Sequence, residues 1–574
     1  METTSEKCRH GILIHGAYVV LIIAIVLTAF CGFYKADFAQ DQPLSYDGDS
    51  LVVLASIRAA EEGGMLPFLP VRIQRLNAPA EAWWSDAPIS ELVYWLPTLL
   101  TRFLGFFPGT SWFVALMLCA AGIAFYFSAI AMRGARVPSA TMGVLFALLP
   151  YAFVRNIEHL TLTLYFVVPV YICSAWNMWG EEGARCSNQR IALLCVLAVL
   201  ASMFNPYYWA MFLILVAFAG VGHVTNLSWR GIAACALLGF SAWVGFLLQN
   251  LDTFYFRWTE GVNNAVISRD LWWMVKFGLY LPDLLLPSTH RIAWLEQLSG
   301  QNYHWKIPIP IQGESQTAYI GMVAALFLVI LIIGGFVGAS AGRRKPMHPF
   351  FWFALVVFGF AVVGGLNYFA GAFGFQMLRA SNRYSIYLAA LGLFYGVMLI
   401  SRIRKPVVMT AVCALILPLG IYDQIPKVPE WLKSQRAAAA ERFRMDREFF
   451  PRMEGVLPPG SEVFQLPRMP FPENGPILNM GDYEHFRPYL HTKNLKFSYG
   501  AVKGRKHAFW QEDLDNKPSA EVIGELKKRN FGAILINRRA YADSGNGTSG
   551  GFLQAGCREI MRNSDFVVLE IPKG

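Results

Sequence analysis

Residues 11–33 read GILIHGAYVVLIIAIVLTAFCGF, an apolar run that contains no Asp, Glu, Lys or Arg. A helix needs about 20 apolar residues to cross the hydrocarbon core of a bilayer, so this run is long enough to span a membrane. It is too long for the apolar core of a signal peptide, and no convincing small-residue cleavage site follows it. We therefore predict a membrane anchor that is retained.

Similar apolar runs recur as far as residue 422. Hydrophobic residues make up 55% of the 574 residues and charged residues 15%, whereas soluble domains are about one-quarter charged. These values exclude a soluble globular enzyme, a disordered protein and a collagen-like chain. We predict about eleven spans, at 11–33, 110–132, 138–155, 160–177, 190–204, 207–224, 231–250, 316–338, 348–368, 384–401 and 406–422, and an interfacial helix at 90–106.

The basic residues predict the orientation of these spans. Short outer loops at 156–159 and 205–208 hold no Lys or Arg, and the net charge of +10 reflects topology rather than nucleic-acid binding. With the N-terminus in the cytoplasm, an odd number of spans places the C-terminus on the outer, periplasmic side. The cytoplasmic loops then hold Lys7, Arg9, Arg133, Arg136, Arg185, Arg190, Arg230, Arg343, Arg344, Lys345, Arg402, Arg404 and Lys405.

Two long loops, 34–109 and 251–315, share the outer face with the polar C-terminal segment. Long loops in compact proteins are usually functional. We predict a polytopic α-helical transmembrane domain at 1–422 and a soluble periplasmic α/β domain at 423–574. In the second domain we expect helices at 430–449 and 518–529, strands near 462–467, 532–537 and 565–572, and a flexible loop near 545–551.

Two acids stand close to the end of the first span, in Tyr46-Asp47-Gly48-Asp49-Ser50. A carboxylate near a membrane surface lies in a partly lowered dielectric, so the pKa of Asp49 or Asp47 can rise toward a value useful for a general base. Two acids around a glycine could instead hold a divalent cation. A solvated turn is the third interpretation, because Asp-Gly is a turn dipeptide.

A second outer turn, Arg155-Asn156-Ile157-Glu158-His159, carries three ionisable groups between two apolar spans. Such groups are costly near lipid unless they are paired or hydrated. His159 could transfer protons near neutral pH, and Arg155 could hold a phosphate through two parallel hydrogen bonds. The alternative is a hydrated cap on a tight turn.

The loop 251–315 contains Arg257, Glu260, His290 and Glu314. Arg257-Trp258 and residues 303–306 combine cations with aromatic rings, a combination that suits phosphates and sugars. Glu314 is notable because it directly precedes the span 316–338. The alternative is a loop whose charges are simply solvated.

Arg379 and Arg383 lie in the last outer loop, against the positive-inside trend. If this loop is helical, two residues four apart share one face. The exception to the trend indicates binding of an anion such as a lipid-linked phosphate. The alternative is that both side chains reach toward lipid headgroups.

This arrangement resembles the GT-C class of membrane glycosyltransferases, and in finer detail the bacterial YfhO-like or "sugar translocase" proteins. The resemblance covers most of 11–405. The matching pieces are Gly48-Asp49, Ala78-Pro79, Leu149-Pro150-Tyr151, His159-Leu160, Pro169, Asn205-Pro206-Tyr207-Tyr208, Leu286-Pro287 with His290, Tyr319-Ile320-Gly321, and Arg379 with Arg383.

The resemblance implies a bacterial inner membrane and, on its periplasmic face, transfer of a hexosyl or pentosyl group from a polyprenyl-phosphate donor to a glycan or lipid acceptor. Asp49, or second Asp47, would deprotonate the acceptor, and Arg379, Arg383 and Arg257 would neutralise the departing phosphate. No second acidic motif is clear, so we expect no metal and no other cofactor. A flippase for lipid-linked sugars and a non-catalytic envelope-assembly protein are the alternatives. The other expected substrate-binding residues are Arg155, Glu158, His159, Glu260, His290 and Glu314.

Overall fold

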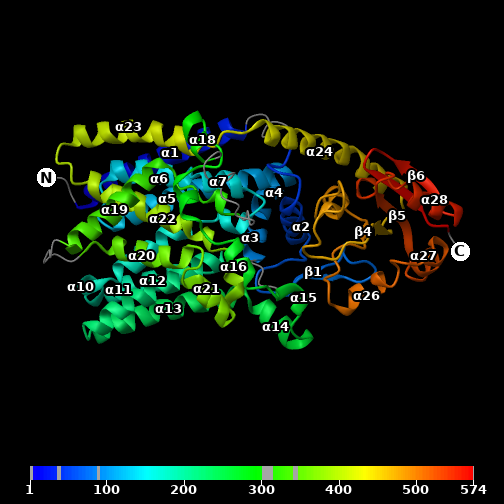
Figure 1. Ribbon diagram of the computed structural model, residues 1–574, viewed down its shortest axis with the longest axis horizontal. Coiled ribbons are helices and arrows are strands. Elements are labelled where there is room, and N and C mark those ends of the chain that lie inside the picture. The colour runs from blue at the N-terminus through cyan, green and yellow to red at the C-terminus, as the bar shows by residue number, and fades with distance from the viewer. Residues whose placement is uncertain (1–3, 35–40, 87–90, 300–313, 341–346, 573–574) are drawn as a thin grey trace.

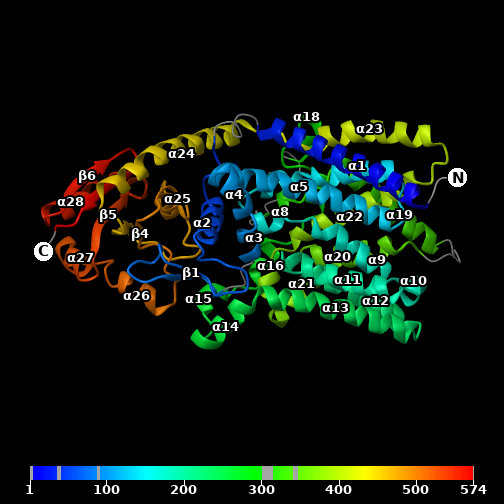
Figure 2. The ribbon, with the colours of Figure 1, turned by 180° about the vertical axis from the view of Figure 1, so that it is seen from behind.

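The computed structural model describes residues 4–34, 41–86, 91–299, 314–340 and 347–572. A long bundle of helices carries the N-terminus at one end, and a smaller α/β part carries the C-terminus at the other (Figure 1). The view from behind shows the same two parts, joined along one edge by α23 and α24 (Figure 2). The predicted basic cluster at 343–345 and the segment 303–306 lie outside the described residues.

Among the described residues, eight helices are long and apolar enough to cross a membrane. Three further predicted spans coincide with apolar helices of 11, 14 and 13 residues, shorter than the about 20 residues of a full span. The eight are Gly11–Tyr34 within α1 (Thr4–Tyr34), α5 (Phe106–Ala131), Arg136–Arg155 (α6, Arg136–Ala147, and α7, Pro150–Arg155), α12 (Pro206–Thr225), α13 (Trp229–Gln249), α19 (Met322–Ser340), Ser381–Ile400 (η6, Ser381–Tyr384, and α22, Ser385–Ile400) and α23 (Pro406–Gln424). The three shorter helices are α9 (Val167–Asn177), α11 (Asn188–Ala201) and α20 (Pro349–Ala361).

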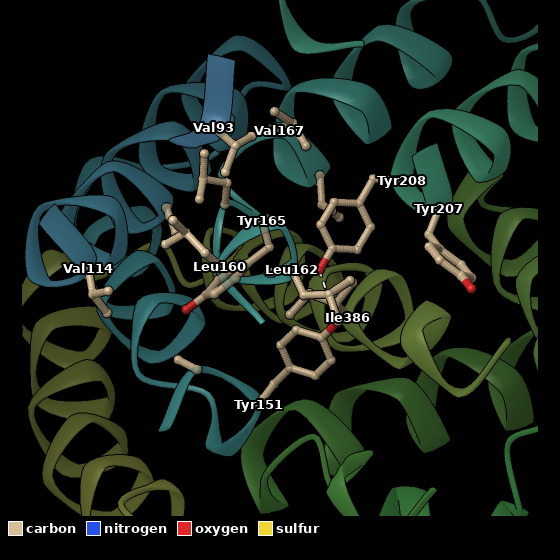
Figure 3. Close-up of a cluster of buried hydrophobic side chains, with 14 of the residues drawn as sticks. Val93, Val114, Tyr151, Leu160, Leu162, Tyr165, Val167, Tyr207, Tyr208 and Ile386 are labelled. Atoms are coloured by element: carbon tan, nitrogen blue, oxygen red, sulfur yellow. Dashed lines mark hydrogen bonds between the residues drawn. The ribbon is translucent and has the colours of Figure 1, made fainter. Parts of the chain in front are cut away.

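Several tyrosines buried in the core of the bundle form hydrogen bonds through their hydroxyl groups. The Asn205 side chain accepts hydrogen bonds from the backbone N–H groups of Tyr207 and Tyr208 and so caps α12, with Pro206 in its first turn. The hydroxyls of Tyr151 and Tyr208 lie 3.0 Å apart and point toward each other (Figure 3). Satisfied hydroxyls allow these large rings to fill the core without leaving a buried polar group unpaired.

The C-terminal part is a mixed sheet with helices, as predicted for an α/β domain. Its strand order is β4-β3-β5-β7-β6, with β3 parallel to β4 and β5, and β7 antiparallel to β5 and β6. The central strand β5 contains the predicted apolar run and is almost entirely buried. The elements are α24 (Glu430–Val456), β3 (Glu462–Leu466), β4 (Lys496–Phe497), α27 (Ser519–Lys528), β5 (Phe531–Asn537), β6 (Arg558–Arg562) and β7 (Phe566–Glu570).

The prediction of a flexible loop at 545–551 is wrong. This segment forms α28 (Asn546–Gln554), despite its glycines. The carboxylate of Asp543 accepts hydrogen bonds from the backbone N–H groups of Gly545 at 2.9 Å and Gly547 at 2.6 Å. These bonds satisfy N–H groups that the first turn of a helix leaves free, which offsets the low helix propensity of glycine.

Loop 34–109 packs directly onto this sheet. The backbone N–H of Phe497 in β4 donates to the carbonyl of Arg75, and the N–H of Ala78 donates to the carbonyl of Phe497. The indole of Trp84 donates to the carbonyl of Gly500 at 3.1 Å. The first outer loop and the C-terminal domain therefore form one layer over the end of the bundle, and this layer contains α2 (Asp49–Glu61).

The interfacial segment 90–106 forms two short helices, α3 (Glu91–Trp95) and α4 (Thr98–Leu104). Pro97 lies between them. Two helices of 5 and 7 residues cannot cross a bilayer, which fits the expectation that this segment does not span it.

Candidate active site

Asp49 is the first residue of α2, at the junction of the helical bundle and the outer layer. Gly48 precedes it with φ +49° and ψ −133°, a backbone conformation that favours glycine. The side chain of Asp49 is 54% exposed. The first turn of α2 thus holds a partly exposed carboxylate.

The surroundings of Asp49 make it more basic than an ordinary aspartate. Partial burial raises its pKa first, and the negative charges of Asp482, Glu314 and Glu473 raise it further, to about 6. Arg383 opposes this shift. Asp49 is then mostly a carboxylate at neutral pH but takes up a proton far more readily than a solvated aspartate, as a general base requires.

His159 lies beside this carboxylate. Its Nε2 is 3.7 Å from Oδ2 of Asp49. Burial, followed by the charges of Arg155 and Arg383, lowers the pKa of His159 to about 3. The ring is therefore neutral at physiological pH, and the contact is neither an ion pair nor a direct hydrogen bond.

Glu314 joins Arg155 and Arg383, and we call these three residues the Glu314 group. Arg155 Nη1 is 2.8 Å from Oε2, and Arg383 donates through Nη2 at 2.9 Å and Nε at 3.2 Å. Burial alone would raise the pKa of Glu314, but the guanidinium groups of Arg383 and Arg155 outweigh it and hold the pKa well below its usual range. Glu314 is thus firmly ionised.

A second carboxylate, Glu473 of the C-terminal domain, faces Arg269 and Arg379. Arg269 Nη2 donates to both carboxylate oxygens at 3.1 and 3.0 Å, while Arg379 Nη2 is 4.0 Å from Oε1. The guanidinium carbon of Arg379 lies 5.6 Å from the ring centre of Trp273 and 5.7 Å from that of Phe277. We call these five residues the Glu473 group.

Arg379 and Arg383 do not share a helix face. Short 3-10 turns at Gln376–Leu378 and Ser381–Tyr384 flank Ala380, whose φ of −91° and ψ of 72° are not helical. This break directs Arg383 to Glu314 and Arg379 to Glu473. The two arginines that are close in sequence therefore belong to two different charge groups.

The side chains of Asp47 and Asp49 have different surroundings. The hydroxyl of Ser45 contacts Asp47 at 3.0 Å and Glu158 at 2.9 Å. All three line a cavity of about 410 Å³ beside α24 that also contains Arg436 and Trp431. Burial raises the pKa of Glu158 to about 7, so this side chain exchanges a proton near neutral pH.

Three predicted substrate-binding residues lie away from these groups. Arg257 donates to the backbone carbonyl of Asp86 at 3.0 and 2.9 Å. Glu260 is exposed, and its backbone carbonyl accepts from Arg505. His290 is buried against Asp423, with Nε2 3.0 Å from Oδ1. Each is engaged in holding segments of the protein together.

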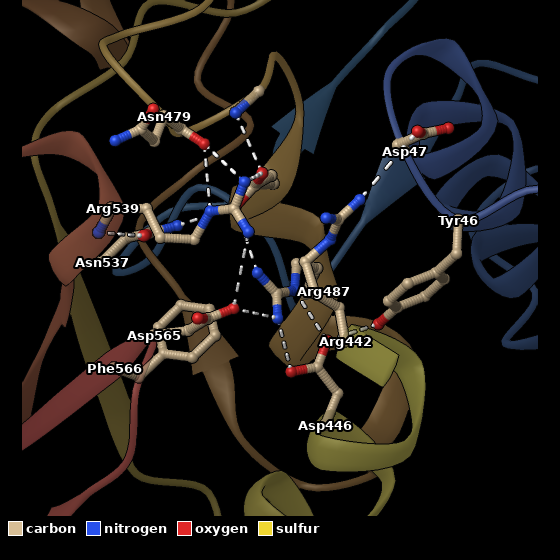
Figure 4. A network of polar contacts seen from close by, with 12 residues as sticks. Tyr46, Asp47, Arg442, Asp446, Asn479, Arg487, Asn537, Arg539, Asp565 and Phe566 are labelled. Atoms are coloured by element: carbon tan, nitrogen blue, oxygen red, sulfur yellow. Dashed lines mark hydrogen bonds and ion pairs between the residues drawn. The ribbon is translucent and has the colours of Figure 1, made fainter. Parts of the chain in front are cut away.

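A buried network ties the Asp47–Asp49 segment to the C-terminal domain (Figure 4). The hydroxyl of Tyr46 donates to Asp446 at 2.8 Å. Arg487, 1% exposed, binds both oxygens of Asp446 at 2.7 and 2.8 Å and Asp565 at 2.9 Å. Sequence reasoning missed this network because its members are single polar residues far apart along the chain.

Sequence reasoning also missed Arg269, Glu473 and Asp482 as neighbours of the site. Each is a single charged residue within a polar segment. Charged residues are common in such segments, so a single one does not indicate a functional site.

The described side chains do not provide a metal site. Within residues 4–34, 41–86, 91–299, 314–340 and 347–572, no group of three or more His, Cys, Asp or Glu residues could hold a metal ion. Asp49 and His159 form a pair without a third donor, and Asp47 lies with Glu158 on the cavity side.

Comparison with solved structures identifies the fold. ArnT from Cupriavidus metallidurans, solved bound to undecaprenyl phosphate, matches with a TM-score of 0.54 and 11% identity over 97% of this chain and 98% of that one. The archaeal oligosaccharyltransferase AglB from Archaeoglobus fulgidus, in complex with an inhibitory peptide and a dolichol-phosphate, matches with a TM-score of 0.41 and 10% identity over 96% and 74%. The second score is too low to carry an argument.

No protein-family model matches the chain, and no curated protein is similar to it. The likeness to ArnT shows that this chain shares the fold of that protein. Eight helices in the described part of the chain are long and apolar enough to cross a membrane, as predicted for a multi-pass helical protein. The narrower resemblance to the YfhO-like proteins stays a prediction.

Proposed function

We propose that this chain is a membrane glycosyltransferase that moves a hexosyl or pentosyl group from a polyprenyl-phosphate donor to a cell-surface glycan or lipid. The reaction takes place on the periplasmic face of a bacterial inner membrane. One observation carries the proposal: Asp49, 3.7 Å from His159 at the end of the helical bundle, is near enough to feel the charges of Glu314, Glu473 and Arg383, and thus of both arginine groups. The fold shared with ArnT supports the same class of reaction.

In the proposed reaction, Asp49 removes the proton of an acceptor hydroxyl. The acceptor oxygen forms a bond to the anomeric carbon of the sugar as the bond from that carbon to the phosphate oxygen breaks. The electron pair of the broken bond stays on the lipid phosphate, whose added negative charge the arginines stabilise. The balance needs no oxidant, reductant or metal.

The two neighbours of Asp49 in the outer turn have supporting roles. Neutral His159 can donate or accept a hydrogen bond without adding a charge that would compete for the carboxylate. Glu158 and Asp47 line the 410 Å³ cavity, which offers polar contacts and aromatic surface to the acceptor. Aromatic faces with polar edges suit a sugar or glycan.

The ligand in the ArnT structure, undecaprenyl phosphate, is the product that a donor of the proposed type leaves behind. The arginines of this chain would hold the same chemical group. A charge-assisted bond from Arg to phosphate is about twice as strong as a neutral hydrogen bond, and two such bonds fix the orientation of the phosphate.

Reconstituted vesicles test the proposal. The purified protein is incubated with a panel of radiolabelled undecaprenyl-phosphate hexoses and pentoses and with a bacterial envelope extract as acceptor. We expect label in the acceptor and release of undecaprenyl phosphate, both lost in Asp49→Asn and kept in Asp515→Asn, which removes an exposed carboxylate paired with Arg468. Movement of intact donor across the bilayer without a product would indicate a flippase, and absence of both, with a copurifying partner, an assembly protein.

A further inference from the structure

The two carboxylates near Asp49 are held with very different strength. Glu314 receives three guanidinium contacts of 2.8–3.2 Å from two arginines. Both terminal nitrogens of Arg155 are engaged, since Nη2 also donates to Thr317 at 2.9 Å, although its buried Nε has no partner among the described residues. The negative charge of Glu314 is thus already balanced by close contacts with both arginines.

The Glu473 group is incomplete by comparison. Both oxygens of Glu473 use the same nitrogen, Nη2 of Arg269. The Nε of Arg269 is buried and, within the described part of the chain, has no hydrogen-bond partner. Arg379 reaches Glu473 only at 4.0 Å and donates to no other acceptor among the described residues. Two arginines therefore share one carboxylate and keep unused donors.

The Glu473 carboxylate also lies at a position from which a ligand can displace it. Its side chain is 50% exposed, whereas Arg269 and Arg379 are 16% and 22% exposed. Its φ of +58° lies in the left-handed region, which a non-glycine residue adopts at a cost of about 1 kcal/mol or more. Its backbone N–H donates to the hydroxyl of Tyr483 at 3.1 Å. A short loop of the C-terminal domain thus presents the carboxylate to the two arginines.

We propose that Arg269 and Arg379, over the rings of Trp273 and Phe277, form the site for the phosphate of the lipid-linked donor, and that Glu473 occupies this site until the phosphate displaces it. The inference rests on the proposed function and names the anion site within it. The phosphodiester of the donor offers two non-bridging oxygens, one for the free Nε of Arg269 and one for Arg379. The monoester that transfer leaves behind has a third such oxygen and one more negative charge. The Glu314 group then holds the neighbouring backbone in place and does not exchange its anion.

This exchange has a consequence for the base. The charge of Glu473 is one of those that raise the pKa of Asp49. A phosphate that takes the place of Glu473 brings negative charge of the same sign to the same place. Asp49 therefore stays basic when the donor is bound, at the moment when the base is needed.

Binding of undecaprenyl phosphate to the full-length protein in detergent tests the inference. We expect Glu473→Gln to tighten binding about five-fold, equivalent to about 1 kcal/mol, because the competing carboxylate is gone. Arg269→Gln and Arg379→Gln should each weaken it about ten-fold or more. Glu570→Gln, which removes a carboxylate from a solvent-exposed pair with Arg558, is the matched control and should leave affinity unchanged.

Two probes, one without the phosphate and one without the lipid tail, separate the contributions of these two groups to binding affinity. Undecaprenol lacks the phosphate, and its binding should not change in Glu473→Gln. Inorganic phosphate lacks the lipid, so we expect it to bind the wild-type protein more weakly than undecaprenyl phosphate does. Equal affinity for the two would contradict a lipid ligand. Unchanged or weaker binding of undecaprenyl phosphate in Glu473→Gln would overturn the inference, whereas failure of the wild-type protein to bind it would overturn the proposed function itself.

Discussion

Glu314 and Glu473 each face two arginines, yet the two groups differ in almost every physical respect. Glu314 is 22% exposed and is contacted at 2.8–3.2 Å by both of its arginines. Glu473 is 50% exposed and uses a single guanidinium nitrogen. A buried, fully paired carboxylate is costly to disturb, while a half-exposed pair contributes little and can exchange its partner.

The comparison shows how one site can hold one carboxylate firmly in place and exchange another carboxylate for a bound anion. The Glu314 group joins the end of α7 to the start of the span Ser381–Ile400, both parts of the bundle. The Glu473 group instead joins the bundle to a loop of the outer layer. Asp49 feels the charge of both carboxylates, so each group can be tested through the base as well as by itself.

Removal of the base should have the largest effect. General acid–base catalysis contributes roughly 10²- to 10⁴-fold, so Asp49→Asn should lower kcat by about that factor. The KM for the donor should change little, because both arginine groups remain. Sugar transfer in proteoliposomes measures this, with Asp515→Asn, at an exposed aspartate paired with Arg468, as the matched control. A variant Asp49→Asn with wild-type kcat would remove Asp49 from the chemistry.

Next in size is the effect of each carboxylate on stability. Glu314→Gln leaves Arg155 and Arg383 without an anion in a mostly buried place, which should cost on the order of 3 kcal/mol of unfolding free energy. Glu473→Gln should cost between about 0 and 1 kcal/mol, as exposed pairs do. Thermal unfolding in detergent compares the two variants directly. Equal losses in both would mean that the groups do not differ as the geometry indicates.

A smaller effect is expected from a change that keeps the charge. Arg379→Lys keeps one positive charge but loses the planar fork and its packing on Trp273 and Phe277. We expect the KM for the donor to rise about ten-fold, which corresponds to about 1.4 kcal/mol, with kcat within about two-fold of wild type. Steady-state kinetics over a range of donor concentrations checks this. A fall in kcat with unchanged KM would contradict a role of Arg379 in binding the donor before the reaction.

The smallest effect is a shift along the pH axis. Asp49 must lose its proton to act as a base, so kcat/KM should rise with pH through about 6 and level off above about 7. The negative charge of Glu473 raises the pKa of Asp49, so Glu473→Gln should move this rising limb to lower pH by less than about one unit. A shift to higher pH, or none, would contradict the electrostatic coupling.

The sequence predicts the bundle well because each span is a local pattern. An apolar run such as 11–33 needs only its own residues to be recognised. The outer domain was predicted for the same reason: β5 is a continuous apolar strand, and α24 and α27 are helices at the expected places. The helix α28 was missed because its first turn is held by Asp543, a cap that glycine-rich composition conceals.

The site is less predictable because its contacts are not local. Sequence reasoning selected Asp49, His159, Glu314 and Arg383 one by one, each from an ionisable group at the edge of an apolar run. Their convergence depends on how distant spans pack. Arg257 and His290 looked equally promising by composition, yet they bind Asp86 and Asp423. No pattern marks Glu473, since its role depends on which arginines it meets.

A structure determined with undecaprenyl phosphate tests the central claim most directly. We predict phosphate density between the guanidinium groups of Arg269 and Arg379, within reach of an acceptor beside Asp49. The Glu473 carboxylate should have moved out of that position, and the contacts of Glu314 with Arg155 and Arg383 should be unchanged. Density at another place, with Glu473 still bound to Arg269, would contradict the account.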